Sequence, residues 1–237
     1  MKRSPTLTAN AKIRAQQKDV LATVRARAAK EAMRAKSANS PEEKFPPAFW
    51  SQPTPADLAV LAAMQRGRRF DPSLVFAIAA RCSHGFPQVT VCAPLTSDGS
   101  PFPTLFWLSC PHLSKKCAEL ESQRLIAELE KEFAAMPEET EKLHEYYASL
   151  REQVMRKAVC HGGGLDMTRA LELMKDCGVG GINWREGPAA VKCLHPQTAT
   201  MLGLGWHPAA AWLREKIGAF ECSVCICTEF ENISATH

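Results

Sequence analysis

The chain has 237 residues, of which 46% are hydrophobic and 23% charged, a composition typical of globular proteins and not of disordered or fibrous ones. Its longest clearly apolar run, residues 74–80, is much shorter than the about 20 residues that cross a bilayer, so no membrane span is expected. Lys2 and Arg3 are not followed by an apolar stretch, which argues against a secretory signal peptide. We therefore expect a cytoplasmic protein.

The net charge of +4 is unevenly distributed along the chain. Residues 1–36 contain ten Lys and Arg but only two Asp and Glu, whereas the remaining residues carry a small acidic excess. This pattern excludes nucleic-acid binding by the whole chain and confines it to a basic arm, residues 1–36, which would contact RNA or an acidic protein. Two alternatives stay open: a solvated helical arm, and a transit peptide for organelle import if the source is eukaryotic.

Residues 1–53 are predicted to form a basic Ala/Lys/Arg-rich arm and a Pro-rich linker, and residues 54–237 a single α+β domain. Residues 9–36 contain neither Gly nor Pro and favour helix. The prolines of 37–53 push the residues before them out of helical geometry.

Local signals place the first elements of this domain. Thr54, followed by proline, predicts a helix start, and Gly67 predicts its end. Strand-like runs follow at residues 74–81, 88–92 and 104–108, with a turn between the first two.

The second half of the domain is predicted to be mainly helical. The expected helices run from 109 to about 133, from about 138 to 159, from Asp166 to Cys177, and onward from Pro196 and from Pro208. Residues 222–230 alternate like a short strand. The predicted fold is α+β: a small sheet of three to four short strands packed with about five helices, preceded by a basic helical arm.

The ten cysteines suggest a metal site, because a chain without a secretory signal and of this length does not need disulfides. Cys82 and Cys110 each follow a predicted strand, and Cys193 and His195 precede a predicted helix. Three thiolates and one imidazole suit a tetrahedral zinc ion, and they also suit an iron–sulfur cluster with one histidine ligand. The alternative is that these cysteines are small core residues.

Cys222, Cys225 and Cys227 are secondary metal candidates, since the first two form a C-x-x-C pair. They would complete the site above, bind a metal separately, or be incidental cysteines of a terminal strand, which we favour. Cys110 has a second candidate role as a nucleophile or redox sensor, because the start of a helix stabilises a thiolate.

No reaction is indicated by the sequence. His144 and Glu145, on a predicted helix, are the candidates for acid/base catalysis, and a hydrogen-bonded core histidine is the alternative for His144. The chain has no H-E-x-x-H motif, and its glycine loops lack the lysine and the spacing of a phosphate-binding loop.

Several blocks of sequence, taken in order, are shared with a known family. They are Arg81-Cys82, Gly85-Phe86-Pro87, the run from Asp98 to Pro111 with its Pro-Phe-Pro-Thr-Leu, Leu120-Glu121, His144-Glu145 with Tyr147 and Arg151, and Val191-Lys192-Cys193-Leu194-His195. The chain resembles, over residues 68–210, a bacterial family catalogued as domain of unknown function 501.

This resemblance implies no established activity, but it bears on the predicted ligands. It implies that the position of Cys110 is Cys in some members and His in others, an exchange that a metal ligand tolerates and a hydrophobic core does not. There are departures from the family pattern: Thr200 stands where relatives often carry a histidine, and His207-Pro208 replaces the usual Asn-Pro.

Two classes of function follow. The first is a zinc or iron–sulfur protein, catalytic or redox-sensing. The second is a non-catalytic binding module that uses the basic arm. A catalytic metal site keeps one coordination position open, whereas a structural site is closed.

Overall fold

The computed structural model describes residues 45–65, 71–96, 98–159 and 167–230. The chain divides into two compact units, Met1–Pro47 and Ala48–His237. All helices and strands of the described residues belong to the second unit. The predicted basic arm and the predicted helix start at Asp166 lie outside the described residues.

Helix α2 (Pro55–Met64) begins as predicted and is fixed to the sheet by one buried carboxylate. Thr54 and Asp57 form a capping box, in which each side chain accepts a hydrogen bond from the other residue's backbone N–H. The same Asp57 carboxylate accepts two hydrogen bonds from Arg81, at 2.6 and 2.8 Å. This guanidinium lowers the pKa of Asp57 to about 2.

Three antiparallel strands form the sheet, in the order β1-β2-β3. They are β1 (Val75–Arg81), β2 (Pro87–Cys92) and β3 (Phe106–Leu108). Every residue of the central strand β2 is buried. The predicted α+β class, the strands expected at 74–81, 88–92 and 104–108, and the turn between β1 and β2 are confirmed.

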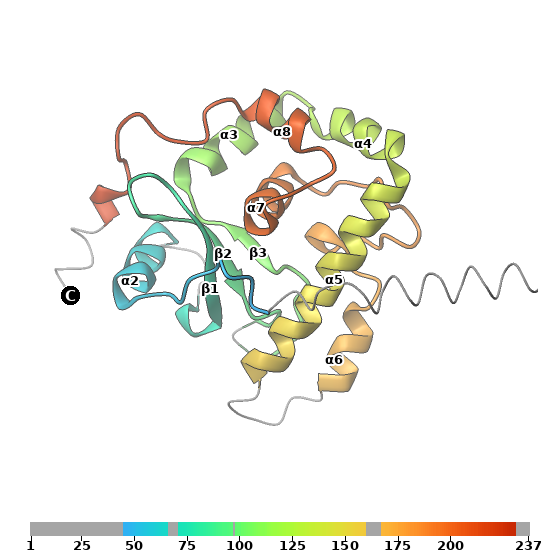
Figure 1. The fold of residues 1–237 in the computed structure, drawn as a ribbon, viewed down its shortest axis with the longest axis horizontal. Coiled ribbons are helices and arrows are strands. Elements are labelled where there is room, and N and C mark those ends of the chain that lie inside the picture. Colours follow the sequence, from blue (N-terminus) through green and yellow to red (C-terminus); the bar gives the residue numbers. More distant parts are fainter. Residues whose placement is uncertain (1–44, 66–70, 97, 160–166, 231–237) are drawn as a thin grey trace, which may run out of the picture. The chain divides into compact units, whose positions relative to one another are not determined.

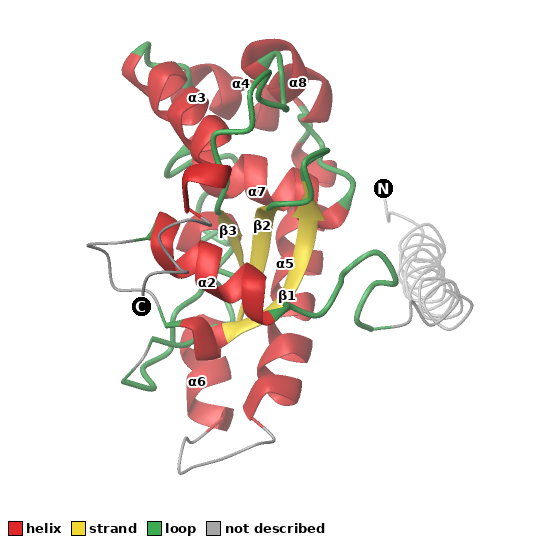
Figure 2. Cartoon of the chain, turned by 90° about the vertical axis from the view of Figure 1, so that its left-hand side faces the viewer, coloured by secondary structure: helices red, strands yellow, loops and turns green. Residues whose placement is uncertain are grey.

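The remaining elements are helical. They are η1 (Pro72–Leu74), α3 (Pro111–Ser122), α4 (Ile126–Ala135), α5 (Pro137–Val159), α6 (Met167–Met174), η2 (Val179–Gly181), α7 (Leu194–Leu204) and α8 (Ala210–Ile217). The described residues thus contain seven α-helices, more than the predicted five. Figure 2 shows α3, α4 and α8 gathered at one end of the sheet and α6 at the other.

Two predicted elements differ from the structure. The helix expected from 109 to 133 is interrupted between α3 and α4, where Arg124 has a φ of 65° and the chain turns so that α4 packs on α5. The strand expected at 222–230 is a series of bends and turns that ends in helical residues 228–230. It pairs with none of the three strands of the described sheet, so the alternating pattern of its residues does not reflect a β-strand.

Helix α7 lies at the centre of the fold (Figure 1) and packs against all three strands and α3. Eight of its residues are buried, including Gln197, Thr198 and Thr200. Gly203 allows the close approach of α7 to β3, since a Cβ there would lie 2.5 Å from the Phe106 ring. The first turn of α7 is therefore held in position by the core.

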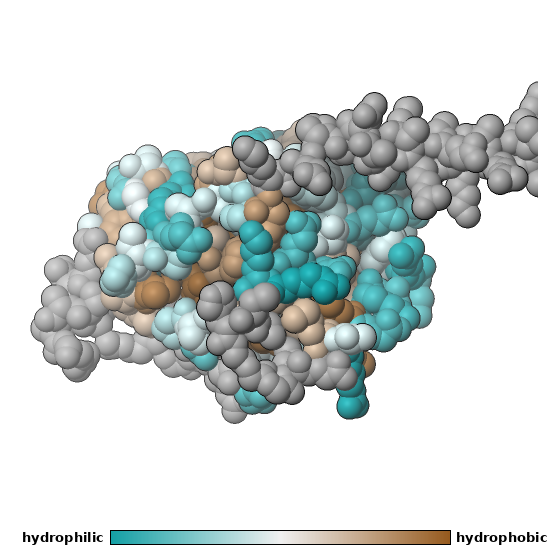
Figure 3. All heavy atoms as spheres, turned by 60° about the horizontal axis from the view of Figure 1, so that its bottom comes forward, coloured by the Kyte–Doolittle hydropathy of each residue, from teal (hydrophilic) through white to brown (hydrophobic). Residues whose placement is uncertain are grey.

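The surface is mixed in character. On the face in Figure 3, hydrophobic side chains form patches between hydrophilic ones. Among the described helices, none is long and apolar enough to cross a membrane.

Candidate metal centre

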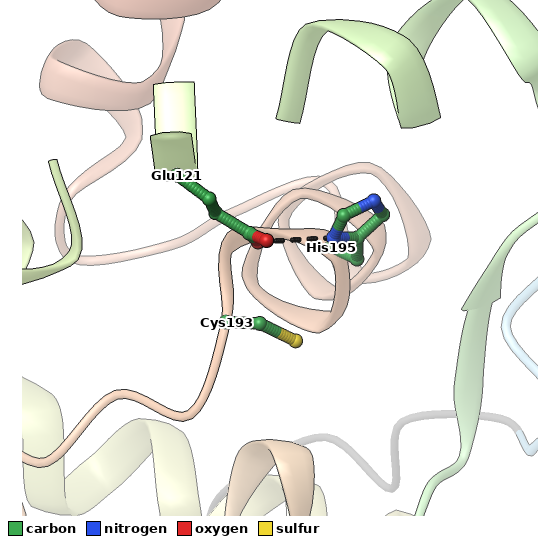
Figure 4. Close-up of side chains that lie close together, drawn as sticks. All are labelled: Glu121, Cys193 and His195. Carbon is green, nitrogen blue, oxygen red and sulfur yellow. Dashed lines mark hydrogen bonds and ion pairs between the residues drawn. The ribbon is translucent and has the colours of Figure 1, made fainter. Parts of the chain in front are cut away.

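Two helices distant in sequence bring three potential metal ligands together. Glu121 lies in the last turn of α3, Cys193 is the N-cap of α7, and His195 lies in the first turn of α7. One ligand atom from each of these residues lies within 4.8 Å of the other two. Figure 4 shows the carboxylate of Glu121 directed at the ring of His195, with the Cys193 side chain beside this pair at the start of α7.

Glu121 is held in place by the residues that it joins. Its Oε1 accepts a hydrogen bond from the backbone N–H of Leu194 at 2.6 Å and lies 3.0 Å from Nδ1 of His195. A carboxylate at this position also interacts favourably with the positive end of the α7 dipole. Glu121 therefore links α3 to α7 even without a metal.

His195 has an oxygen atom facing each of its ring nitrogens. Nδ1 faces Glu121, and Nε2 lies 3.2 Å from the carbonyl oxygen of Ser114. A neutral imidazole carries one N–H, so it donates to only one of these oxygens. With Nε2–H donated to Ser114, the lone pair of Nδ1 is free for a cation shared with Glu121. Histidine ligands in metal sites are usually held in this way.

Cys193 is half-buried, and its environment disfavours the thiolate. Burial raises the pKa of its thiol, and the negative charge of Glu121 raises this pKa further. A divalent cation between Cys193 and Glu121 would reverse this effect by taking the place of the proton.

A second thiol lies beside the group. Cys117, one helical turn before Glu121 on α3, is fully buried, and its sulfur lies 3.4 Å from the hydroxyl of Thr198. Burial raises the pKa of Cys117 to about 11, with smaller contributions from Glu121 and Cys193. Cys117 is outside the 4.8 Å group.

The structure brings together two of the four predicted ligands, Cys193 and His195. Cys110 is the N-cap of α3, eleven residues before Glu121, which corresponds to roughly 16 Å along the helix. Cys82 lies in the turn after β1, in the same apolar cluster as Cys225 and Cys227.

The predicted role of Cys110 as a reactive thiolate is not favoured by its surroundings. Backbone N–H groups of His112 and Leu113 lower the pKa of its thiol, as expected at a helix start, but burial has the larger effect and the net shift is upward. A protonated thiol is a poor nucleophile.

His144 and Glu145 are not members of the group of three ligands. His144 is fully buried: Nε2 lies 2.9 Å from the carbonyl oxygen of Pro188, and Nδ1 accepts a hydrogen bond from the backbone N–H of Val179 at 3.2 Å. Burial lowers its pKa, which favours the neutral imidazole that the hydrogen bond accepted by Nδ1 requires. Glu145 is exposed. Their acid/base role stays a prediction, and the contacts of His144 are those of a hydrogen-bonded core histidine.

Glu121 is a potential ligand that the sequence patterns do not predict. Its only signal was its place in the Leu120-Glu121 block shared with the family, because no spacing rule connects a residue on α3 with two residues some 70 positions later.

Comparison with known families shows the family of this chain. A family model described as "Protein of unknown function (DUF501)" matches residues 78–215. The chain belongs to the DUF501 family. No curated protein and no solved structure matches it. Within this DUF501 chain, Glu121, Cys193 and His195 lie in the matched segment, whereas Cys222, Cys225 and Cys227 follow it. The family description names no activity.

Proposed function

We propose that this DUF501 protein binds a zinc ion through Glu121, Cys193 and His195. The observation that carries the proposal is that one ligand atom from each residue lies within 4.8 Å of the others, on two helices that pack together. Thiolate, imidazole and carboxylate are the three ligand types that zinc accepts in proteins.

The mixed ligand set favours zinc over the alternatives. Iron–sulfur clusters are held mainly by several thiolates, and this group supplies one. Calcium and magnesium prefer ligand sets made of oxygen, and this group has one carboxylate.

Three protein ligands leave one tetrahedral position for water. Such an open position is typical of catalytic zinc, which lowers the pKa of its bound water to about 7 and polarises carbonyl groups. We therefore expect the zinc ion to take part in hydrolysis or to act as a Lewis acid. A redox-sensing role is less well supported, because burial and Glu121 raise the pKa of Cys193.

The test is the metal content of protein purified anaerobically, compared between wild type, Cys193→Ala and His195→Ala. We expect each variant to contain one equivalent of zinc less than the wild type. Cys92→Ala is the matched control, because it removes a buried thiol from β2 that is not a member of the ligand group. Folded site variants with the zinc content of the wild type would disprove the proposal.

A second candidate function is contact with RNA or an acidic protein through residues 1–36. The supporting observation is that this arm contains ten basic and only two acidic residues. Binding through the arm would weaken steeply with added salt, because phosphate contacts release counterions. Deletion of residues 1–36 should abolish such binding, and binding that survives the deletion would exclude the arm.

A further inference from the structure

Residues 219–230, which we call the C-terminal segment, return to the far end of α3 and to the turn after β1. Figure 1 shows this segment leaving α8, passing α3 and reaching the β1–β2 turn. The amide of Gln88 donates to the carbonyl oxygen of Phe220 at 3.0 Å, and the backbone N–H of Ser83 donates to Glu221 at 3.0 Å. The chain is therefore docked here through specific polar contacts.

Two histidines extend this docking. Nε2 of His112, at the start of α3, lies 3.0 Å from the carbonyl oxygen of Ala219. Nε2 of His84, in the turn after β1, lies 3.3 Å from the carbonyl oxygen of Cys222. The segment thus contacts two separate elements of the domain.

The docked segment creates a cluster of five thiols. Cys222, Cys225 and Cys227 come from the segment, Cys82 from the turn after β1, and Cys110 from the N-cap of α3. They are five of the nine cysteines in the described residues. We call this group the thiol cluster.

Backbone contacts around β2 hold two of these thiols to the domain. Cys110 N–H donates to the carbonyl oxygen of Gln88 at 3.2 Å, and Cys82 N–H donates to that of Phe86 at 3.0 Å. Cys82 and Cys225 pack against the apolar cluster formed by the buried side chains of Cys227, Val60 and Phe86.

The five thiols lie close enough to affect one another. Burial raises the pKa of Cys227 to about 12, with smaller contributions from Cys110, Cys82, Cys225 and Cys222. These thiols carry their protons when no metal is bound, and a metal ion would take the place of those protons.

We propose that the thiol cluster is a second metal centre, distinct from the site at Glu121, in which Cys82, Cys110 and two of the three segment cysteines are ligands. Four thiolates select a soft metal, either a zinc ion or an iron–sulfur cluster. Full coordination closes such a site, so its role is to fasten the segment to the domain and not to activate a substrate.

The thiols of the cluster are too far apart in this structure to hold one metal ion together. Among the described residues, only the group at Glu121 has its ligand atoms within 4.8 Å of one another. The thiol cluster therefore contracts when it binds metal, and the segment, which has no strand pairing within the described sheet, is the part able to move. Metal binding should rigidify residues 219–230 more than any other described part of the chain.

The test measures metal per chain in four full-length proteins purified anaerobically. They are the wild type, the double variant Cys222→Ser with Cys225→Ser, Cys193→Ala, and the control Cys92→Ala. Both cysteines changed in the double variant are only half-buried, so folding should persist, and circular dichroism checks it. We expect one metal less in the double variant and one less in Cys193→Ala, with no loss in the control.

These outcomes separate the two proposals. Loss in the double variant alone would support the thiol cluster and contradict the zinc site at Glu121, whereas loss in Cys193→Ala alone would do the reverse. A brown chromophore that disappears in the double variant identifies an iron–sulfur cluster, and a colourless protein with zinc identifies zinc.

A second measurement does not depend on metal stoichiometry. Hydrogen exchange in residues 219–230 should accelerate at least several-fold when a chelator removes metal from the wild type. The double variant should show the fast rate from the start. Equal rates in the wild type before and after chelation, with metal removal verified, would overturn the thiol cluster as a metal centre.

Discussion

The carboxylate of Glu121 lies 3.0 Å from Nδ1 of His195, across the contact between α3 and α7. This contact involves Nδ1, the nitrogen that we assign to zinc. When zinc binds, the contact is replaced by two bonds to the same ion, one from Glu121 and one from Nδ1. The charge of Glu121, and not its hydrogen bond to Leu194, is then what the metal requires.

Glu121→Gln tests this distinction, because a glutamine amide oxygen still accepts a hydrogen bond from the N–H of Leu194. We expect zinc affinity to fall by at least about tenfold, the order seen when even supporting groups of a metal site are removed. Competition with a chromophoric chelator measures it. Glu130→Gln is the matched control: Glu130 accepts a hydrogen bond from Val191 N–H at 3.1 Å and is outside the ligand group. Equal losses in both variants would mean that Glu121 acts only as a helix cap.

Acid should destabilise the fold through His207. This buried ring lies 3.0 Å from Oε1 of Gln197 and accepts a hydrogen bond from Ala209 N–H, and burial lowers its pKa to about 3. The unfolded histidine binds a proton near its ordinary pKa of 6.5, so the unfolded state holds more protons between pH 6.5 and about 3. Stability is therefore lost as the pH falls through this range, by up to about 1.4 kcal/mol per pH unit.

Urea denaturation at pH 7.5 and pH 5 measures this loss. His207→Asn should show a smaller decrease, and the remaining decrease should include His144, whose pKa is also lowered by burial. An identical decrease in the wild type and His207→Asn would show that His207 does not govern the acid response.

Two threonines of α7 should respond in opposite directions to the same substitution. The hydroxyl of Thr200 is buried and has no hydrogen-bond partner among the described residues, whereas that of Thr198 lies 3.4 Å from the sulfur of Cys117. An unsatisfied buried polar group costs about 1–3 kcal/mol. Thr200→Val should therefore raise the free energy of unfolding by about 1 kcal/mol, and Thr198→Val should lower it. Destabilisation by Thr200→Val would indicate a hydrogen-bond partner that these contacts do not include.

Gly178 lies against the ring of His144, so closely that an added Cβ would meet Nδ1 at 2.4 Å. Gly178→Ala should therefore destabilise the protein by about 1–3 kcal/mol, the usual cost of overpacking a core. Gly187→Ala is the control, because its Cβ would meet only Ala190, at an ordinary distance of 3.8 Å. Thermal unfolding of the two variants measures the difference, and similar melting temperatures would show that the His144 ring can move aside.

Local signals in the sequence were sufficient for the elements that local interactions determine. Thr54 followed by Pro55 predicted the start of α2, and the apolar runs predicted β1 and β2. The break between α3 and α4 at Arg124 is not predicted by any glycine or proline, because it results from the packing of α4 on α5. The regular spacing of residues 222–230 predicts a strand, whereas in the structure this segment places three cysteines near two others.

The candidate site was predictable only in part, for the same reason. Cys193 and His195 are neighbours in sequence and precede a predicted helix, so their place at the end of an element predicts them. The sequence does not show which element ends lie together in the fold, and this is why Cys82 and Cys110 were predicted beside Cys193. The length of α3 sets Cys110 and Glu121 apart, and no sequence pattern reports which end of that helix meets α7.

The burial of α7 has a consequence for the rate at which its site would exchange a ligand. Cys193 and His195 are attached to the first turn of a helix that packs on every strand of the described sheet. Such a helix opens only when the core opens, whereas peripheral segments open by local fluctuation. The ligands of an ion held at α7 would therefore keep their arrangement after the ion leaves, whereas those beside residues 219–230 would rearrange, so rebinding should be faster at α7.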